Sequence, residues 1–166
     1  MSTRLVMPQE AHAAMVAGWS RSAEEARRWC SVAEDPFPVD RVRGWWAEAD
    51  VQPWLLVTEP DARPVGYGEL WLEEEEDEVE LARLIVDPAQ RRQGWGRALV
   101  AQLVAAAQAT GLSGCLLRVV PDNVAATGLY RSTGFAEVDA DRAAEWNQGQ
   151  PAGYRWFEWP RLAPGP

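Results

Sequence analysis

Apolar residues in the first fifty positions recur at helical spacing in three segments. The second segment, 22–30, opens with Ser22 three residues before Glu25, which is the pattern of a capping box. Two prolines separate it from the third segment, 39–50. The apolar positions that share a helical face are Ala13, Val16 and Ala17 in the first segment and Val42, Trp45 and Trp46 in the third. We therefore predict that the first fifty residues are helical.

From Pro53 onward the pattern changes to short strands. Two apolar runs, 53–59 and 65–74, are separated by the turn sequence Pro-Asp-Ala-Arg-Pro. A third run, 79–86, follows six consecutive acidic residues over 73–78, which are typical of a solvated turn. Strands joined by such short turns predict a three-stranded antiparallel meander.

The second half of the chain alternates between helices and strands. An apolar stripe and Gly111 as a C-terminal cap predict a helix over 94–110. A strand over 114–120, a short helix over 123–133 and closing strands over 135–140 and 153–162 follow. This order predicts an α/β fold, in which a mixed sheet is flanked by helices, within a single domain over 1–166.

Composition excludes several classes of protein. Hydrophobic residues make up 47% of the 166 residues, which suits a globular chain rather than a disordered one. A net charge of -9 argues against sequence-independent nucleic-acid binding. No apolar run reaches the roughly 20 residues of a membrane span. One histidine and two distant cysteines, Cys30 and Cys115, leave little material for a metal site, and we expect a cytoplasmic protein with reduced thiols.

The segment Arg91-Arg92-Gln93-Gly94-Trp95-Gly96-Arg97 is basic within an acidic protein and begins the predicted helix. Glycines let backbone amides approach a ligand, and a helix N-terminus with nearby arginines favours an anion. Other interpretations are a structural turn with surface arginines, a Walker-type loop and a dinucleotide fingerprint. No Gly-Lys-Ser/Thr follows the glycines, and Leu99 stands where the dinucleotide fingerprint needs Gly or Ala.

Two motifs in sequence order resemble those of the GCN5-related N-acetyltransferase family. Arg91-x-x-Gly94-x-Gly96 after Val-Asp-Pro resembles its acetyl-CoA signature, and the segment NVAATGLYRSTGF (123–135) resembles its later Asn-x-x-Ala-x-x-x-Tyr-x-x-x-Gly-Phe motif. The resemblance covers about residues 53–140. It implies a mostly antiparallel central sheet that splays between its fourth and fifth strands, usually because of a β-bulge.

The resemblance also implies a set of cofactor-binding residues. Backbone amides of the glycine loop would bind the pyrophosphate of acetyl-CoA, and the end of the fourth strand would pair with its pantetheine arm like an extra strand. The implied residues are Leu84, Ile85, Val86, Arg91, Arg92, Gln93, Gly94, Trp95, Gly96, Arg97, Asn123 and Ala126. Asn123 also suits the N-cap of the short helix.

Two residues are the candidates for proton transfer. In the family, the tyrosine at the position of Tyr130 protonates the departing thiolate; otherwise this residue is a packed aromatic. Strand alternation places Glu80 on one face with Ala82, Leu84 and Val86, and we predict Glu80 as the base; otherwise it is a surface carboxylate. Some relatives that acetylate protein N-termini carry a glutamate five residues before the motif asparagine. Here Arg118 stands at that position, which disfavours a ribosomal-protein acceptor.

The acceptor pocket is expected between the early helices and the last loop. The candidate residues are Trp29, Glu145 and Trp146, together with Asp35, Phe37, Trp45, Trp46 and Asn147. Aromatic faces and carboxylates favour a small cationic acceptor, although tryptophans are more often core residues. The sequence therefore predicts an acetyl-CoA-dependent N-acetyltransferase acting on a primary amine. The alternative is an acyl-CoA-binding sensor or interaction domain, and the choice between monomer and homodimer stays open.

Overall fold

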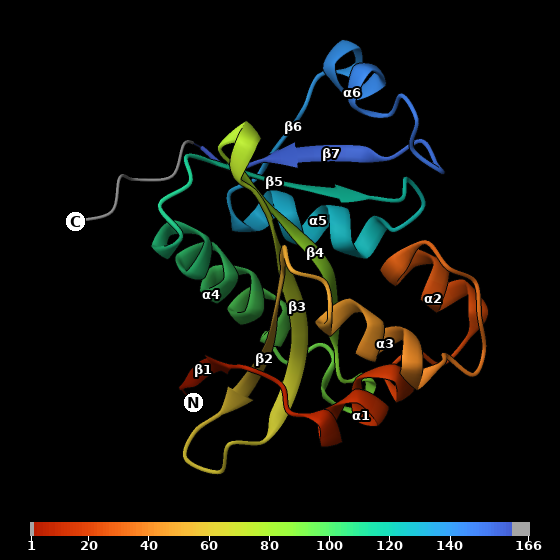
Figure 1. The fold of residues 1–166 in the computed structure, drawn as a ribbon, viewed down its shortest axis with the longest axis vertical. Coiled ribbons are helices and arrows are strands. Elements are labelled where there is room, and N and C mark those ends of the chain that lie inside the picture. The colour runs from red at the N-terminus through yellow and green to blue at the C-terminus, as the bar shows by residue number, and fades with distance from the viewer. Residues whose placement is uncertain (1, 161–166) are drawn as a thin grey trace.

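A seven-stranded sheet forms the centre of the computed structural model, which describes residues 2–160 (Figure 1). The strand order is β1-β2-β3-β4-β5-β7-β6. All neighbouring strands are antiparallel except β4 and β5, which are parallel. The strands are β1 (Thr3–Val6), β2 (Val51–Thr58), β3 (Pro64–Glu73), β4 (Glu78–Val86), β5 (Gly114–Val119), β6 (Ala136–Glu137) and β7 (Arg155–Glu158). The predicted α/β fold and the β2-β3-β4 meander are confirmed.

Helices cover both faces of the sheet (Figure 1). They are α1 (Ala13–Gly18), α2 (Ala23–Cys30), α3 (Val39–Trp46), α4 (Trp95–Ala109), α5 (Val124–Thr133) and α6 (Ala140–Trp146), with short 3-10 turns η1 (Glu10–His12), η2 (Glu74–Glu76) and η3 (Pro88–Gln90). Within residues 2–160, every helix is too short or too polar to span a bilayer. The middle of the acidic run forms η2, and residues 73–77 are solvent-exposed, as predicted, whereas Glu78 is half-buried at the start of β4.

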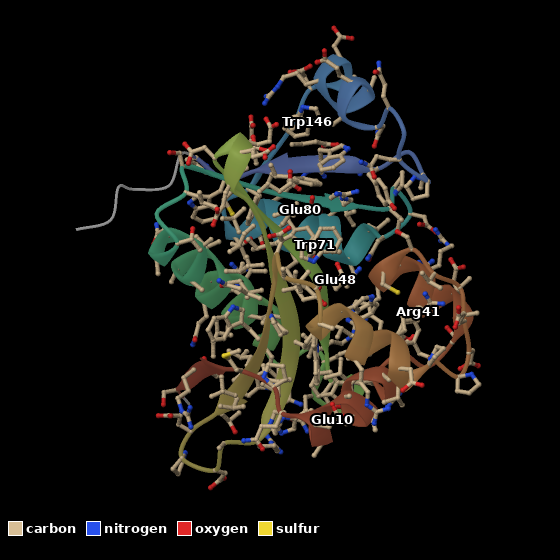
Figure 2. All side chains as sticks on the ribbon, in the orientation of Figure 1. Glu10, Arg41, Glu48, Trp71, Glu80 and Trp146 are labelled. Atoms are coloured by element: carbon tan, nitrogen blue, oxygen red, sulfur yellow. The ribbon has the colours of Figure 1, made fainter. Side chains whose placement is uncertain are left out.

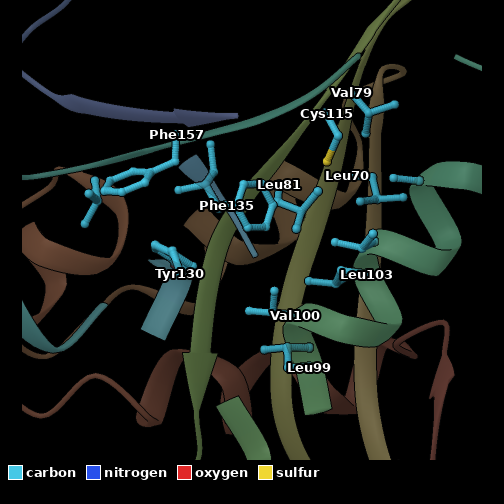
Figure 3. Close-up of a cluster of buried hydrophobic side chains, with 14 of the residues drawn as sticks. Leu70, Val79, Leu81, Leu99, Val100, Leu103, Cys115, Tyr130, Phe135 and Phe157 are labelled. Carbon is cyan, nitrogen blue, oxygen red and sulfur yellow. The ribbon is translucent and has the colours of Figure 1, made fainter. Parts of the chain in front are cut away.

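Two apolar clusters hold these helices on the sheet. On the α4 face, Leu99, Val100 and Leu103 pack against the strands, and Tyr130 of α5 joins the same cluster (Figure 3). On the α3 face, residues of α1, α2 and α3 pack on β2 and β3, with Ile85 of β4. The sheet between the clusters is buried on both faces, so a functional group on it must lie at an opening between strands.

Such an opening lies between β4 and β5. Their ladder contains three pairs, from Glu78 opposite Gly114 to Glu80 opposite Leu116. Beyond Glu80 the strands separate, and Figure 1 shows β5 and β7 turned away from β3 and β4. The splay that the family resemblance implies is therefore present. We call the gap beyond Glu80 the parting.

A β-bulge in β4 lies beside the parting. Tyr67 of β3 pairs with Ile85 and Glu69 pairs with Ala82, so β4 has one residue more than β3 over this stretch. Arg83 within the bulge has a left-handed backbone, with φ of 51°. A bulge increases local twist and bends its strand, which accounts for the divergence of β4 from β5.

The bulge also changes the alternation of side chains along β4. We expected Glu80, Ala82, Leu84 and Val86 to share one face, and this is wrong. The extra residue reverses the alternation, so that Leu84 packs against the α4-face cluster while Ile85 joins the cluster on the α3 face. Glu80 and Ala82 lie before the bulge and line a pocket beside α2.

Three other elements differ from the sequence prediction. The first fifty residues are not all helical, because Thr3–Val6 pairs with β2 as an edge strand. The predicted strand 135–140 is reduced to β6, since Asp139 caps α6 with its side chain and turns the chain into a helix that was not predicted. The last strand ends at Glu158, and residues 161–162 of its predicted range lie outside the described residues.

Candidate active site

The glycine loop presents backbone amides at the N-terminus of α4. Gly94 is the N-cap residue with φ of 87°, and Arg92 is also left-handed with φ of 62°. Among the described residues 2–160, no side chain caps this helix end, and the first helical hydrogen bond joins the amide of Ala98 to the carbonyl of Gly94 at 3.1 Å. The N–H groups before Ala98 are therefore available to an anion, and the helix dipole reinforces their attraction.

The two glycines of the loop serve different purposes. Gly94 takes a left-handed conformation that costs other residues about 1–2 kcal/mol. Gly96 lets α4 approach α5, because a Cβ there would lie 3.1 Å from Cδ2 of Leu129. Only Gly94 shapes the amide cradle itself, whereas Gly96 sets the distance between the helices beside it.

Two of the three loop arginines are bound within the protein. Arg91 donates from Nε to the carbonyl of Val86 at 3.2 Å and pairs with Glu25 of α2. Arg97 donates to the carbonyl and the hydroxyl of Ser132 on α5, at 3.1 and 3.0 Å. Within residues 2–160, Arg92 has no such partner. It is exposed and is the loop arginine best able to contact a ligand.

The remaining predicted cofactor residues lie around the parting. Leu84, Ile85 and Val86 form the end of β4, where one edge pairs with β3 and β5 has already diverged. Trp95 begins α4 half-buried, and Gln93 is exposed. At the start of α5, Asn123 accepts a hydrogen bond from the amide of Ala126 at 3.3 Å, as expected for an N-cap.

Tyr130 is buried on the α4 face beside Phe135 and Phe157 (Figure 3). Burial raises the pKa of its phenol to about 12. Its hydroxyl makes no hydrogen bond to any group within residues 2–160. The side chain is thus both a packed aromatic and a phenol that keeps its proton at neutral pH.

A pocket of about 400 Å³ lies beside the parting on the α3 face. We call it the α2 pocket. Its walls come from the end of α2, from β4 over 80–83, from β5 and its following residues over 118–120, and from the loop before β7. Its charged lining residues are Arg28, Glu80, Arg83 and Arg118, and its aromatic ones are Trp29, Trp71 and Tyr154. A volume of this size suits a small organic molecule.

Glu80 is buried in this pocket and paired with Arg118. Nε and Nη2 of Arg118 donate to the two carboxylate oxygens of Glu80 at 2.8 and 2.7 Å. Burial raises the pKa of Glu80, and the Arg118 guanidinium opposes that rise. The third nitrogen of Arg118 donates to Gln150 at 2.7 Å, and its guanidinium lies 4.6 Å from the ring centre of Trp156. Arg118 therefore binds Glu80 and Gln150 together in the pocket wall.

A second buried ion pair, Glu69 with Arg83, was not predicted. Glu69 accepts from Tyr67 at 2.5 Å, from Trp71 at 2.8 Å and from Arg83 at 2.8 Å. Arg83 stacks between Trp45 and Trp71, with its guanidinium carbon 4.1 and 4.7 Å from the two ring centres. A charged residue inside the apolar run VELARLIV was the sequence signal that could have drawn attention to Arg83.

Helix α2 connects the two sides of the parting. On the β4 side, Glu25 pairs with Arg91, and the indole of Trp29 donates to the carbonyl of Arg83 at 2.8 Å. On the β5 side, Arg27 pairs with Asp122 at 2.5 Å. In addition, the hydroxyls of Ser31 and Tyr154 lie 2.7 Å apart. These contacts place Trp29 in the wall of the pocket.

The structure does not bring Glu145 and Trp146 together with Trp29. Glu145 is exposed on α6, and Trp146 packs edge-on against Trp156 at 5.3 Å between ring centres. Figure 2 shows Trp146 beside α6, away from the neighbouring Trp71 and Glu80. The other candidates have structural contacts: Phe37 and Trp45 are core residues, Trp46 donates to Tyr67, and Asn147 bonds the backbone of Tyr154. Asp35 is exposed.

Comparison with known proteins identifies the family. The model of the Acetyltransferase (GNAT) family matches residues 19–135. The chain belongs to this family. The match includes the glycine loop, the strands that border the parting and Tyr130.

Two curated relatives match parts of the chain. One is a mycothiol acetyltransferase from Clavibacter michiganensis subsp. michiganensis, 30% identical over an alignment of 133 residues that covers 74% of this chain and 43% of that protein. Another is the [ribosomal protein bS18]-alanine N-acetyltransferase of Escherichia coli (strain K12), 41% identical over 66 residues, 40% of this chain and 45% of the relative. The chain thus spans less than half the length of these relatives.

A solved structure of similar fold is the spermidine N-acetyltransferase from Vibrio cholerae in complex with CoA and spermine. The TM-score is 0.70 at 17% identity, and the match covers 82% of each chain. At this identity the likeness concerns the fold alone. It confirms that the chain has the fold of this acetyltransferase.

We predict that Arg118→Met lowers the free energy of unfolding more at high pH than at low pH. Without its partner the buried Glu80 carboxylate costs about 3–5 kcal/mol. Burial already raises the pKa of Glu80 in the folded state, so the native protein binds this proton more tightly than the unfolded chain does. That contribution to stability is present at low pH and is lost as pH rises through the folded-state pKa. Urea unfolding near pH 5 and pH 8 measures the difference.

The double variant Glu80→Gln, Arg118→Met is the control. It removes both charges, so it should be more stable near pH 8 than Arg118→Met alone. Equal losses at both pH values for the single variant would contradict this account of the pair.

Proposed function

We propose that this protein is an acetyl-CoA-dependent N-acetyltransferase that acts on the primary amine of a small acceptor. The observation that carries the proposal is the parting between β4 and β5. On its β4 side lie the glycine loop and α4, and on the α3 face beside it lies the α2 pocket with Glu80. This arrangement provides separate places for an anionic cofactor and for an amine, as direct transfer between two substrates requires.

The residues of the site fit acetyl-CoA, which when bound supplies a thioester carbonyl activated for attack by an amine. The amides after Gly94 and the exposed Arg92 suit its pyrophosphate. The free edge of β4 over 84–86 suits the amide groups of its pantetheine arm, in the manner of an added strand. The same β4 backbone offers N–H groups to a developing oxyanion.

Tyr130 is proposed as the proton donor to the leaving group. Burial raises the pKa of its phenol to about 12, so the hydroxyl carries its proton throughout the neutral range. A general acid has to be protonated before transfer, and this requirement is met. Packing against Phe135 and Phe157 fixes the ring, which limits the directions in which the proton can be delivered.

Glu80 is proposed to take the proton of the acceptor amine. Each of its oxygens accepts one hydrogen bond from Arg118, and a carboxylate oxygen has a second lone pair. Its pKa is raised by burial, which makes it a stronger base than an exposed glutamate. Proton transfer to Glu80, directly or through a water, therefore remains compatible with the Arg118 pair.

A covalent acyl-cysteine step is not part of the proposal. Burial raises the pKa of Cys30 and raises that of Cys115 to about 12, so both thiols stay protonated at neutral pH. A protonated thiol is a weak nucleophile. Direct attack by the amine requires fewer steps and uses the residues already placed at the parting.

The alternative function is an acyl-CoA-binding sensor or interaction domain. The observation that favours it is the pair formed by Arg118 and Glu80, because the predicted base is already engaged. Thiol release from acetyl-CoA across a panel of primary amines separates the two functions. Tight cofactor binding with no release above background for any amine would support the sensor.

We expect Gly94→Ala to raise the dissociation constant for acetyl-CoA about five- to thirtyfold. A Cβ disfavours the left-handed backbone at this N-cap by about 1–2 kcal/mol, so the amides should turn away from the phosphate position. Isothermal titration calorimetry provides the measurement. Gly44→Ala is the matched control, because Gly44 is an exposed glycine of α3 with open space at its Cβ position. Equal affinities for the two variants would show that the loop is only a turn.

We expect Tyr130→Phe to lower kcat by about 10²-fold or more while cofactor affinity stays nearly constant, because only the acidic hydroxyl is lost.

Glu80→Gln should respond differently to pH. Near pH 9 to 10 a larger fraction of the acceptor amine is already neutral, so this variant should regain much of its rate, whereas Tyr130→Phe should not. Full activity in both variants across the pH range would refute these assignments even if acetyl-CoA binds.

A further inference from the structure

Arg83 lies in the wall of the α2 pocket with a strained backbone, and neighbouring residues hold both its carbonyl and its guanidinium. Its backbone is left-handed within the bulge of β4, a conformation that is strained for any residue with a side chain. The indole of Trp29 holds its carbonyl at 2.8 Å, and Trp45 and Trp71 enclose its guanidinium. Strain maintained by surrounding contacts is typical of residues at functional sites.

The guanidinium of Arg83 is only partly used by the protein. Nη1 donates to Oε1 of Glu69 at 2.8 Å. Within residues 2–160, neither Nε nor Nη2 has an acceptor at hydrogen-bond distance. The side chain is 17% exposed, and Arg83 is one of the residues that line the α2 pocket. The two unused donors can therefore serve a ligand in that pocket.

The charged side chains that line the pocket offer more hydrogen-bond donors than acceptors to a ligand. Three arginines, Arg28, Arg83 and Arg118, line the pocket against one carboxylate, Glu80. Each arginine also has an acidic partner: Arg118 pairs with Glu80, Arg83 with Glu69, and Arg28 with Glu24 and Asp122 at 3.5 and 3.6 Å. Glu69 lies fully buried behind Arg83 and is not part of the lining. The two carboxylates on which the expected cationic acceptor depended, Asp35 and Glu145, are exposed and are not among the residues that line the pocket.

We propose that the acceptor carries a carboxylate as well as its amine, and that Arg83 binds this carboxylate with its free N–H groups. This inference rests on the proposed acetyltransferase function and names its acceptor class as amino acids or similar amino carboxylates. The planar fork of a guanidinium matches the two oxygens of a carboxylate. Glu80 in the same pocket disfavours a more highly charged phosphate, and the volume of about 400 Å³ accommodates an amino acid with its side chain.

The test compares matched acceptors that differ only in the carboxylate. Alanine, methionine and phenylalanine are each assayed with acetyl-CoA beside the corresponding amino acid amide and decarboxylated amine, with spermidine as a polycation. Since amine basicity differs within each set, the diagnostic quantity is the ratio of kcat/KM for the acid to that for the amide, in the wild type and in variants. For at least one side chain the wild type should prefer the acid.

Two variants and a control assign that preference to Arg83. Arg83→Lys keeps the charge but removes the fork, and the double variant Arg83→Met, Glu69→Gln removes both members of the ion pair so that no buried charge is left alone. Each should lower the acid-to-amide ratio by roughly 10- to 100-fold, the range expected for lost charge-assisted hydrogen bonds. Arg63→Met, in the exposed β2–β3 turn, should leave the ratio unchanged. Circular dichroism checks that the variants fold.

A binding measurement without turnover supports the same conclusion independently. In calorimetry, an N-acetylamino acid product should bind the wild type more tightly than its amide, and this difference should disappear in Arg83→Lys. Thiol release with amides or amines but with no preference for acids would overturn the carboxylate proposal and leave the acetyltransferase function intact. Absence of thiol release with every acceptor, despite acetyl-CoA binding, would instead overturn the function on which this inference rests.

Discussion

The β-bulge at Arg83 is the constraint on which the rest of the site depends. One extra residue in β4 bends the strand away from β5 just beyond Glu80, where their ladder ends. The same bulge exchanges the faces of the following residues, so that Leu84 anchors β4 to the α4 side and Ile85 to the α3 side. It also directs Arg83 into the α2 pocket. A single backbone irregularity thereby opens the sheet and places a charged side chain at the opening.

Two buried ion pairs fix the orientation of the charged side chains on the α3 face. The pairs are Glu69 with Arg83 and Glu80 with Arg118. Both guanidiniums lie near the ring of Trp71, at 4.7 and 5.6 Å from its centre. Such pairs contribute little net stability relative to apolar residues, because desolvation offsets their attraction. Their value is in geometry: each guanidinium is fixed in orientation by a carboxylate and by aromatic faces. A substrate would therefore meet charges that need no rearrangement.

Local patterns in the sequence were sufficient for the meander, α4, α5 and the glycine loop, because these elements depend on nearby residues such as Gly94, Gly111 and Asn123. Patterns could not reveal the bulge, since the extra residue in β4 is defined only by its pairing with β3. For the same reason they assigned Leu84 and Val86 to the wrong face. The pairing of Arg118 with Glu80 and of Arg83 with Glu69 joins different strands, and no spacing rule connects such residues. Trp146 was grouped with Trp29 because loop order alone does not show which side of β7 a helix occupies.

Hydrogen exchange with and without acetyl-CoA is the most direct test of the claim that the parting is the cofactor site. Backbone amides of β4 over 84–86 and of the loop over 92–97 should gain protection when acetyl-CoA is added, because the ligand would take the place of the missing strand. The β4–β5 ladder over 78–80 and 114–116 is already paired and should change little. Unchanged exchange at 84–86 and 92–97 with saturating acetyl-CoA would contradict the account.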